Sequence, residues 1–123
     1  YFSEFSRSGK LLFEGEFPRP DLSYRTTVEP WVGLPLSPPV GAVRDRAGAT
    51  TVYASWNGAT RVASWRVLAG AAGGRLRAVA TAARSGFETA IALPRDYASL
   101  ELQALDARGG VIGTSRRFSG STR

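Results

Sequence analysis

The 123-residue sequence contains no cysteine, no histidine and no methionine. The lack of cysteine excludes disulfides and thiolate metal sites, and the lack of histidine excludes imidazole ligands and every catalytic triad with a histidine base. No apolar run reaches the length of about 18 residues that a membrane-spanning helix needs. Much of enzyme chemistry is therefore excluded for this chain, and we expect no cofactor, no metal and no membrane span.

Turn-forming residues are common, and no segment shows sustained helical periodicity. The chain has 14 glycines and 7 prolines, 21% charged residues and a hydrophobic fraction of 43%. This composition favours short strands separated by turns, and the length allows one core of ordinary size.

The net charge is +6, and Lys10 is the only lysine beside fifteen arginines. Such an excess attracts polyanions when the charges gather on one face. Here they are dispersed and not interleaved with the aromatic side chains on which nucleic-acid bases stack, so we predict no nucleic-acid partner. The closest groups are Arg44 with Arg46, Arg75 with Arg77, and Arg116 with Arg117.

The composition changes near residue 40, because six of the seven prolines and four of the six phenylalanines precede it. The stretch 30–39 contains four prolines and cannot continue a helix or a regular strand ladder, so it is predicted to be a stiff connector. We predict two parts: a β-hairpin with its connector over residues 1–34, and a β-sandwich over residues 35–123.

The first part begins with two strand-like runs, Tyr1–Phe5 and Leu11–Phe17, which flank the turn-rich residues 6–10. Alternation places Leu11, Phe13 and Phe17 on one face together with Gly15. A two-stranded hairpin is marginal in water by itself, so this aromatic face must be covered. The cover comes either from the rest of this chain or from a larger body.

The second part shows short alternating segments with turn signals between them, a pattern typical of an all-β sandwich. The predicted strands are 42–46, 50–56, 62–68, 76–82, 87–93, 99–106 and 110–118. Their predicted inner faces are Val52, Ala54, Trp56, Ala63, Trp65, Val67, Phe87, Ile91, Leu93, Leu100, Leu102 and Ala104.

The dipeptide Asn57-Gly58 favours a two-residue hairpin turn, which would keep its two flanking strands in one sheet. That register would place Arg61 on the same face as Val52 and Trp56. A longer loop through Thr60 that crosses between sheets keeps both tryptophans inside, and we therefore favour the crossing loop.

Two stretches resemble a fibronectin type III module. Val52-Tyr53-Ala54-Ser55-Trp56, followed after a loop by Trp65-Arg66-Val67, is similar to its second and third strands. Leu100 to Gly109 resembles its sixth strand and exit turn. The family's corner tyrosine is expected near Leu100, whereas the nearest tyrosine here is Tyr97. The resemblance implies a seven-stranded fibronectin type III or Ig-like sandwich.

A second resemblance spans the connector. Ser23-Tyr24-Arg25, Pro30-Trp31-Val32-Gly33-Leu34-Pro35, and Tyr53 to Thr60 are similar in order to the C-terminal part of bacterial arylsulfotransferase-like proteins, in which a small sandwich follows a β-propeller. The resemblance implies an extracellular or cell-envelope protein whose hairpin lies at the propeller edge. Transfer in that family uses a propeller histidine, and this chain has none, so no catalytic residue carries over.

Four side chains are candidate ligand-binding residues. Arg25 would face the central site of a propeller, since a guanidinium suits sulfate; alternatively it ties the connector to a strand carbonyl or carboxylate. Tyr24, Trp31 and Tyr53 would line a platform for a glycan or an aromatic ligand; alternatively Tyr24 and Trp31 pack the hairpin and the connector against the sandwich. The rival function is accordingly an autonomous extracellular module that binds a glycan or a protein.

The remaining polar groups have structural interpretations. Glu14 and Glu16 share one strand face, and we assign them to the polar side of the hairpin rather than to an acid–base or calcium pair. Asp45, Asp96 and Asp106 lie in turn-like contexts beside arginines and are predicted to form turns with local charge partners.

Overall fold

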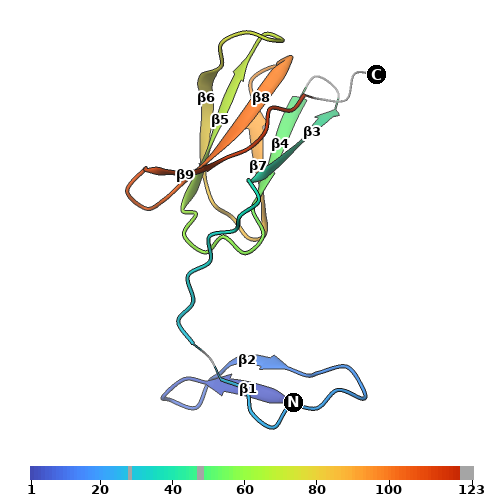
Figure 1. Ribbon diagram of the computed structural model, residues 1–123, viewed down its shortest axis with the longest axis vertical. Helices are drawn as coiled ribbons and strands as arrows, with labels where there is room; N and C mark the ends of the chain where they lie inside the picture. Colours follow the sequence, from blue (N-terminus) through green and yellow to red (C-terminus); the bar gives the residue numbers. More distant parts are fainter. Residues whose placement is uncertain (28, 47–48, 120–123) are drawn as a thin grey trace. The chain divides into compact units, whose positions relative to one another are not determined.

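The computed structural model describes residues 1–27, 29–46 and 49–119, and within them the chain forms antiparallel strands and no helix (Figure 1). The prediction of an all-β fold is confirmed. Three sheets are present, with the orders β1-β2, β3-β4-β7 and β6-β5-β8-β9. The strands are β1 (Phe2–Phe5), β2 (Leu11–Gly15), β3 (Val40–Arg46), β4 (Ala49–Ser55), β5 (Ser64–Gly70), β6 (Arg77–Ala83), β7 (Glu88–Leu93), β8 (Ser99–Leu105) and β9 (Val111–Thr114).

The chain divides into two compact units, Tyr1–Pro30 and Trp31–Arg123. The sequence places the division after residue 34, whereas the structure groups residues 31–34 with the second unit. The reason is a contact across 27 residues of sequence, because Gly33 exchanges hydrogen bonds with Thr60 in the loop between β4 and β5.

The first unit is a hairpin closed by the turn Ser6–Lys10, in which the Ser6 amide donates to the Lys10 carbonyl at 2.8 Å. The Phe2 ring lies 5.8 Å from the Phe13 ring and 5.3 Å from the Phe17 ring, centroid to centroid. Gly15 pairs with Phe2 and leaves room for that ring, since a Cβ at Gly15 would lie 2.6 Å from it. The three phenylalanines thus form one aromatic cluster.

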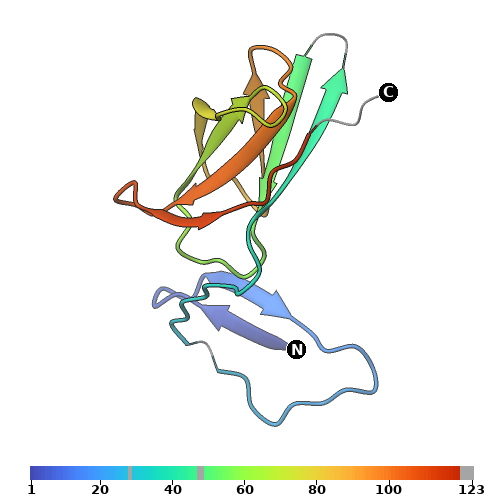
Figure 2. The same cartoon turned by 45° about the horizontal axis from the view of Figure 1, so that its top comes forward.

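The second unit is a β-sandwich of the β3-β4-β7 and β6-β5-β8-β9 sheets (Figure 2). Inner and outer residues alternate along β4, β5, β7 and β8, as a half-buried strand requires. Ten of the twelve predicted inner residues are buried. The buried core is Val52, Ala54, Trp56, Ala59, Val62, Trp65, Val67, Ala69, Ile91, Leu93, Leu100, Leu102 and Ala104.

The prediction of an inner position was wrong for two residues, Phe87 and Ala63. Phe87 is 72% exposed, because β7 begins only at Glu88 and the chain bends just before it. Thr89 takes the first inner position instead, and its hydroxyl accepts a hydrogen bond from the Ser85 amide at 2.9 Å. Ala63 is likewise exposed, since it precedes the start of β5.

The crossing loop predicted after Asn57-Gly58 is confirmed, because β4 and β5 belong to different sheets. The Ala59 amide donates to the Trp56 carbonyl at 3.2 Å, and Gly58 adopts a positive φ of 81° that closes this turn. The chain then continues to the opposite sheet, so that Trp56 and Trp65 both lie in the core.

Candidate functional site

The four candidate residues fall into two pairs, one in each unit. Tyr24 and Arg25 belong to the hairpin unit, where the Tyr24 side chain is 96% exposed. The Arg25 guanidinium carbon lies 5.9 Å from the centre of the Tyr24 ring, a cation–π distance. The Ser23 hydroxyl donates to the Arg25 carbonyl at 2.7 Å and holds this turn.

Trp31 lies at the start of the sandwich unit and is 66% exposed. Its ring lies over Gly33, where a Cβ would be 2.5 Å from the indole, and near Gly58. Gly33 is buried at this crossing, and its amide donates to the Thr60 hydroxyl at 2.9 Å. Trp31 therefore covers the contact between the connector and the loop after β4.

Tyr53 lies on the outer face of the three-stranded sheet, as alternation indicates. It pairs with Ala42 of β3 on one side and Ala90 of β7 on the other. The ring pairs among the described residues involve only the phenylalanines of the hairpin, so Tyr53 and Trp31 do not form a stacked pair. The structure thus joins Tyr24 with Arg25 but does not assemble the four residues into one platform.

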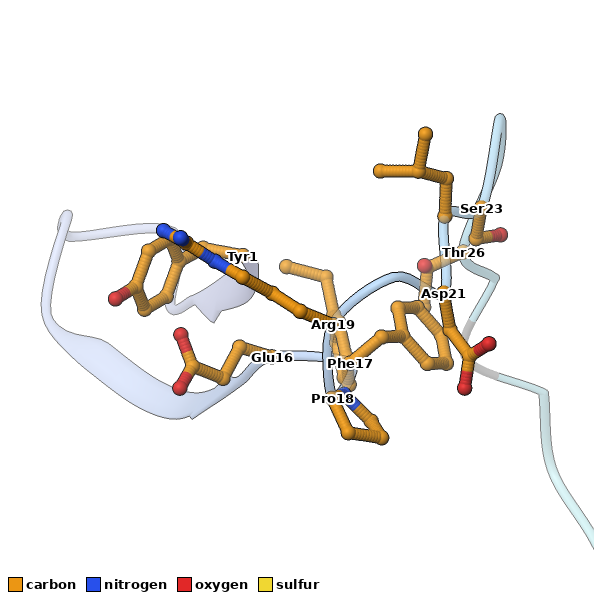
Figure 3. A pocket seen from close by; sticks show the side chains of 10 residues that line it. Tyr1, Glu16, Phe17, Pro18, Arg19, Asp21, Ser23 and Thr26 are labelled. Atoms are coloured by element: carbon orange, nitrogen blue, oxygen red, sulfur yellow. The ribbon is translucent and has the colours of Figure 1, made fainter.

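A cavity of about 440 Å³ lies within the hairpin unit (Figure 3). Aromatic rings of Tyr1 and Phe17 line it together with the charged side chains of Glu16, Arg19 and Asp21. Aromatic faces combined with polar groups of both signs suit a neutral polar ligand such as a sugar better than a simple ion. Sequence reasoning missed this cavity, and its only signal is the alternation of aromatic and charged residues around two prolines.

A second cavity, of about 490 Å³, lies between the loop after β4 and the β8–β9 turn. Its lining includes Arg61, Arg108 and the Asp106 carboxylate. Asp106 Oδ1 accepts hydrogen bonds from the Gly110 and Arg108 amides, each at 2.9 Å. These bonds, led by that from Gly110, and the nearby charges of Arg61 and Arg108 lower the pKa of Asp106 below its ordinary value. Asp106 therefore forms the turn that the sequence predicts.

The other two predicted turn carboxylates have a different partner. The Thr50 hydroxyl, which is buried, lies 2.8 Å from Asp45 Oδ1 and also contacts Asp96 Oδ1. Among the residues that the structure describes, the one ion pair is between Arg117 and Glu101, at 4.0 Å. The predicted ion pairs of Asp45 with Arg44 and of Asp96 with Arg95 are therefore absent, whereas the side chain of Arg46, the other predicted partner of Asp45, lies outside the described part of the chain.

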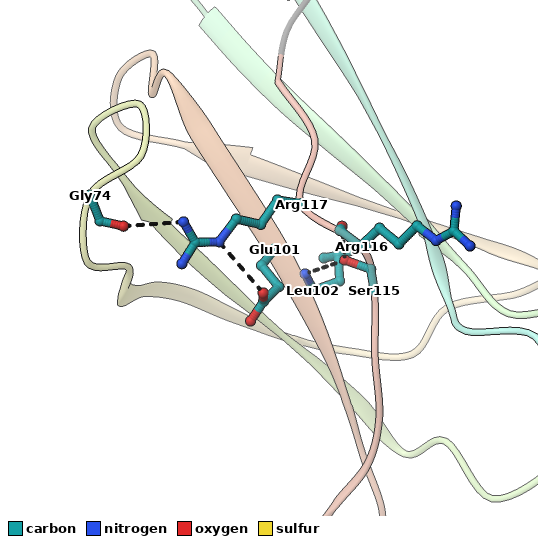
Figure 4. Close-up of polar contacts among 6 residues, drawn as sticks. All are labelled: Gly74, Glu101, Leu102, Ser115, Arg116 and Arg117. Carbon is teal, nitrogen blue, oxygen red and sulfur yellow. Dashed lines mark hydrogen bonds and ion pairs between the residues drawn. The ribbon is translucent and has the colours of Figure 1, made fainter.

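A third cavity, of about 290 Å³, lies between the start of β3 and the segment Ser115–Phe118 that follows β9. Figure 4 shows that Arg117 in this segment reaches Glu101 and the Gly74 carbonyl, whereas the Arg116 side chain extends in another direction. Both arginines line this largely apolar cavity, and Arg116 is the one whose guanidinium has no partner among the described residues.

The described residues contain no group of three acidic side chains placed to hold a metal ion. No helix in this part of the chain is long and apolar enough to cross a membrane. Comparisons with protein families, with curated proteins and with solved structures find no match for this chain.

Proposed function

We propose that this chain is a non-catalytic accessory part of an arylsulfotransferase-like exported protein, with a structural or clasping role beside a β-propeller. The motif order of the sequence supports this proposal, and one structural observation carries it. The hairpin forms its own compact unit yet leaves Phe5 59% and Phe13 54% exposed. Two strands with an uncovered aromatic face are marginal alone, so a partner sheet would supply the missing cover.

The strand pairing supports the fibronectin type III or Ig-like type proposed for the sandwich. The sheet β3-β4-β7 corresponds to the first, second and fifth strands of an Ig sandwich, and β5-β8-β9 to its third, sixth and seventh. The remaining strand, β6, pairs with β5. On this proposal the chain acts outside the cell membrane, in the envelope or beyond it.

The proposal assigns sulfuryl transfer to the propeller, because the sequence has no histidine to serve as the nucleophile. The purified chain should therefore release no phenol from an aryl sulfate donor in the presence of a phenolic acceptor. Turnover by the chain alone would contradict the assignment.

The clasping role is tested by binding. A β-propeller domain of an arylsulfotransferase, lacking its own C-terminal part, should co-elute with this chain in size-exclusion chromatography. Phe13→Ser, on the exposed aromatic face, should abolish the complex. Phe87→Ser is the matched control, because Phe87 is a phenylalanine of the sandwich that is even more exposed than Phe13. Equal binding by both variants would show that the hairpin is not part of the interface.

The second candidate function is an autonomous extracellular module that binds a glycan. The cavity of the hairpin unit favours it, since Tyr1, Phe17, Glu16 and Arg19 combine stacking surfaces with hydrogen-bonding groups. A glycan array probed with the chain would separate the two candidates. Binding that disappears in Glu16→Ala supports the glycan module, whereas an array without signal leaves the propeller as the partner of the hairpin.

A further inference from the structure

The strand β3 lies at the edge of its sheet and is paired regularly. Among the described residues it pairs with β4 alone, and the register runs without a shift from Val40 opposite Ser55 to Arg46 opposite Ala49. In an antiparallel edge strand, alternate residues direct their N–H and C=O groups away from the sheet. Such an edge is a template for one more strand unless something blocks it.

In the four-stranded sheet, the pairings of both edge strands contain register shifts, whereas the pairing of β3 with β4 contains none. The β5–β6 pairing shifts register at Val67/Leu68, and the β8–β9 pairing shifts at Ala104/Leu105. Bulges of this kind twist an edge strand and prevent its pairing with other chains. The three-stranded sheet keeps unshifted pairings between all its described strands, so its edges remain competent to pair.

The third cavity lies beside the edge strand β3. Its walls are Ser37–Gly41, at the start of β3, and Ser115–Phe118 of the opposite sheet. The two segments run side by side in Figures 1 and 2. The Phe118 ring packs on Gly41, where a Cβ would lie 2.3 Å from it. A strand added to β3 could therefore direct one side chain, near Val40 and Gly41, into this cavity.

A β-bulge brings two neighbouring arginines to the wall of the cavity. The Leu102 amide donates to the Ser115 hydroxyl at 2.8 Å, and the Leu100 amide donates to the Phe118 carbonyl at 2.8 Å. Two residues of the segment thus stand opposite the single residue Glu101 of β8. They are Arg116 and Arg117.

The two arginines differ in their partners. Arg117 forms the ion pair with Glu101 and donates to the Gly74 carbonyl at 3.3 Å (Figure 4). Arg116 is exposed, lines the cavity, and its guanidinium has no hydrogen bond or ion pair within the described residues. An unpaired guanidinium at the mouth of an apolar cavity is suited to a carboxylate.

The positive net charge of the sandwich favours a negatively charged partner. Residues 31–123 contain twelve arginines against five aspartates and glutamates, a net charge of +7, whereas residues 1–30 have a net charge of −1. An acidic partner would be attracted to the sandwich before contact and held at Arg116 after it.

We propose that the β3 edge binds an extended acidic segment of a partner protein as an added β-strand. Main-chain hydrogen bonds to β3 supply the affinity. One partner side chain occupies the cavity beside Phe118, and an acidic side chain pairs with Arg116. All residues involved belong to the sandwich, so the inference stands independently of the propeller.

The test uses the full 123-residue chain and a capped heptapeptide that alternates valine with glutamate and threonine. Amide chemical shifts should change along β3 and at Phe118, and the same peptide with glutamine in place of glutamate should bind about tenfold more weakly. A version N-methylated at alternate amides should not bind, because it cannot donate to a strand edge.

Arg116→Gln should weaken binding of the glutamate peptide about tenfold and leave binding of the glutamine peptide unchanged. Arg117→Gln is the control and should bind both peptides as the unmodified chain does. The proposal is overturned if the shifts map to β7 or to the hairpin, or if both arginine variants behave alike. Binding of a sulfated polysaccharide through Arg116, without binding of any peptide, would overturn it in favour of simple anion recognition.

Discussion

Gly33 and Thr60 form a reciprocal pair of hydrogen bonds across 27 residues of sequence. The Gly33 amide donates to the Thr60 hydroxyl at 2.9 Å, and the Thr60 amide donates to the Gly33 carbonyl at 3.1 Å. The Gly58 carbonyl lies close to Gly33 and leaves no room for a Cβ there. The connector is therefore fastened to the sandwich from residue 31 onward, and the hairpin precedes that attachment.

Thr60→Val removes the hydroxyl that the Gly33 amide needs and should destabilise the sandwich by about 1 kcal/mol. Thr60→Ser keeps the hydroxyl and should cost less. Urea unfolding gives the stabilities, and hydrogen exchange at the Gly33 amide reports the bond directly. Unchanged protection of that amide in Thr60→Val would show that the pair does not hold the connector.

Gly113→Ala should destabilise the sandwich by about 1 to 3 kcal/mol through overpacking. A Cβ at this position of β9 would lie 2.5 Å from the Trp56 ring, which fills the end of the core. Thr114→Ala, at the exposed neighbouring position, serves as the control. If thermal melting gave equal transitions for the two variants, the Trp56 ring would not occupy the space beside Gly113.

The two core tryptophans should respond differently to replacement by phenylalanine. The Trp56 indole N–H donates to the Ser37 carbonyl at 2.6 Å, whereas the buried Trp65 indole nitrogen has no acceptor among the described residues. Both variants lose ring volume, but only Trp56→Phe also loses a hydrogen bond worth about 1 kcal/mol. Trp56→Phe should therefore unfold at the lower urea concentration, and the reverse order would contradict the assignment of the bond.

Asp106 should make part of the stability depend on pH in the acid range. Its folded-state pKa lies below the ordinary value of 3.8, so protons bind the unfolded chain more strongly. The stabilisation by Asp106 is complete at a pH above the pKa of the unfolded chain, and it disappears as the pH falls through the lower pKa of the folded chain. The melting temperatures of the unmodified chain and Asp106→Asn should differ at pH 7 and converge at acidic pH. A constant difference would contradict this account.

Alternation predicted the sandwich strands because inner and outer faces repeat every two residues from Val52 to Trp56 and from Leu100 to Ala104. The same rule failed at Phe87, because a local pattern does not reveal where β7 begins. The place of Gly33 depends on a partner 27 residues away, which no local pattern contains.

The candidate site was less predictable than the fold. Residue type and order alone point to Tyr24, Arg25, Trp31 and Tyr53, whereas the structure places these residues in two units. Arg116 is a candidate binding residue because the bulge turns its side chain away from that of Arg117. Such a bulge is visible only once the pairing of Ser115–Phe118 with β8 is known.

The central claim is that the sandwich is complete without the hairpin, whose aromatic face serves a partner. The most direct test compares urea unfolding of the full chain with that of residues 31–123. We predict the same cooperative transition and midpoint for both, with unchanged amide shifts in β3 to β9. Loss of the cooperative transition in residues 31–123 would contradict the claim and make the hairpin part of the sandwich fold.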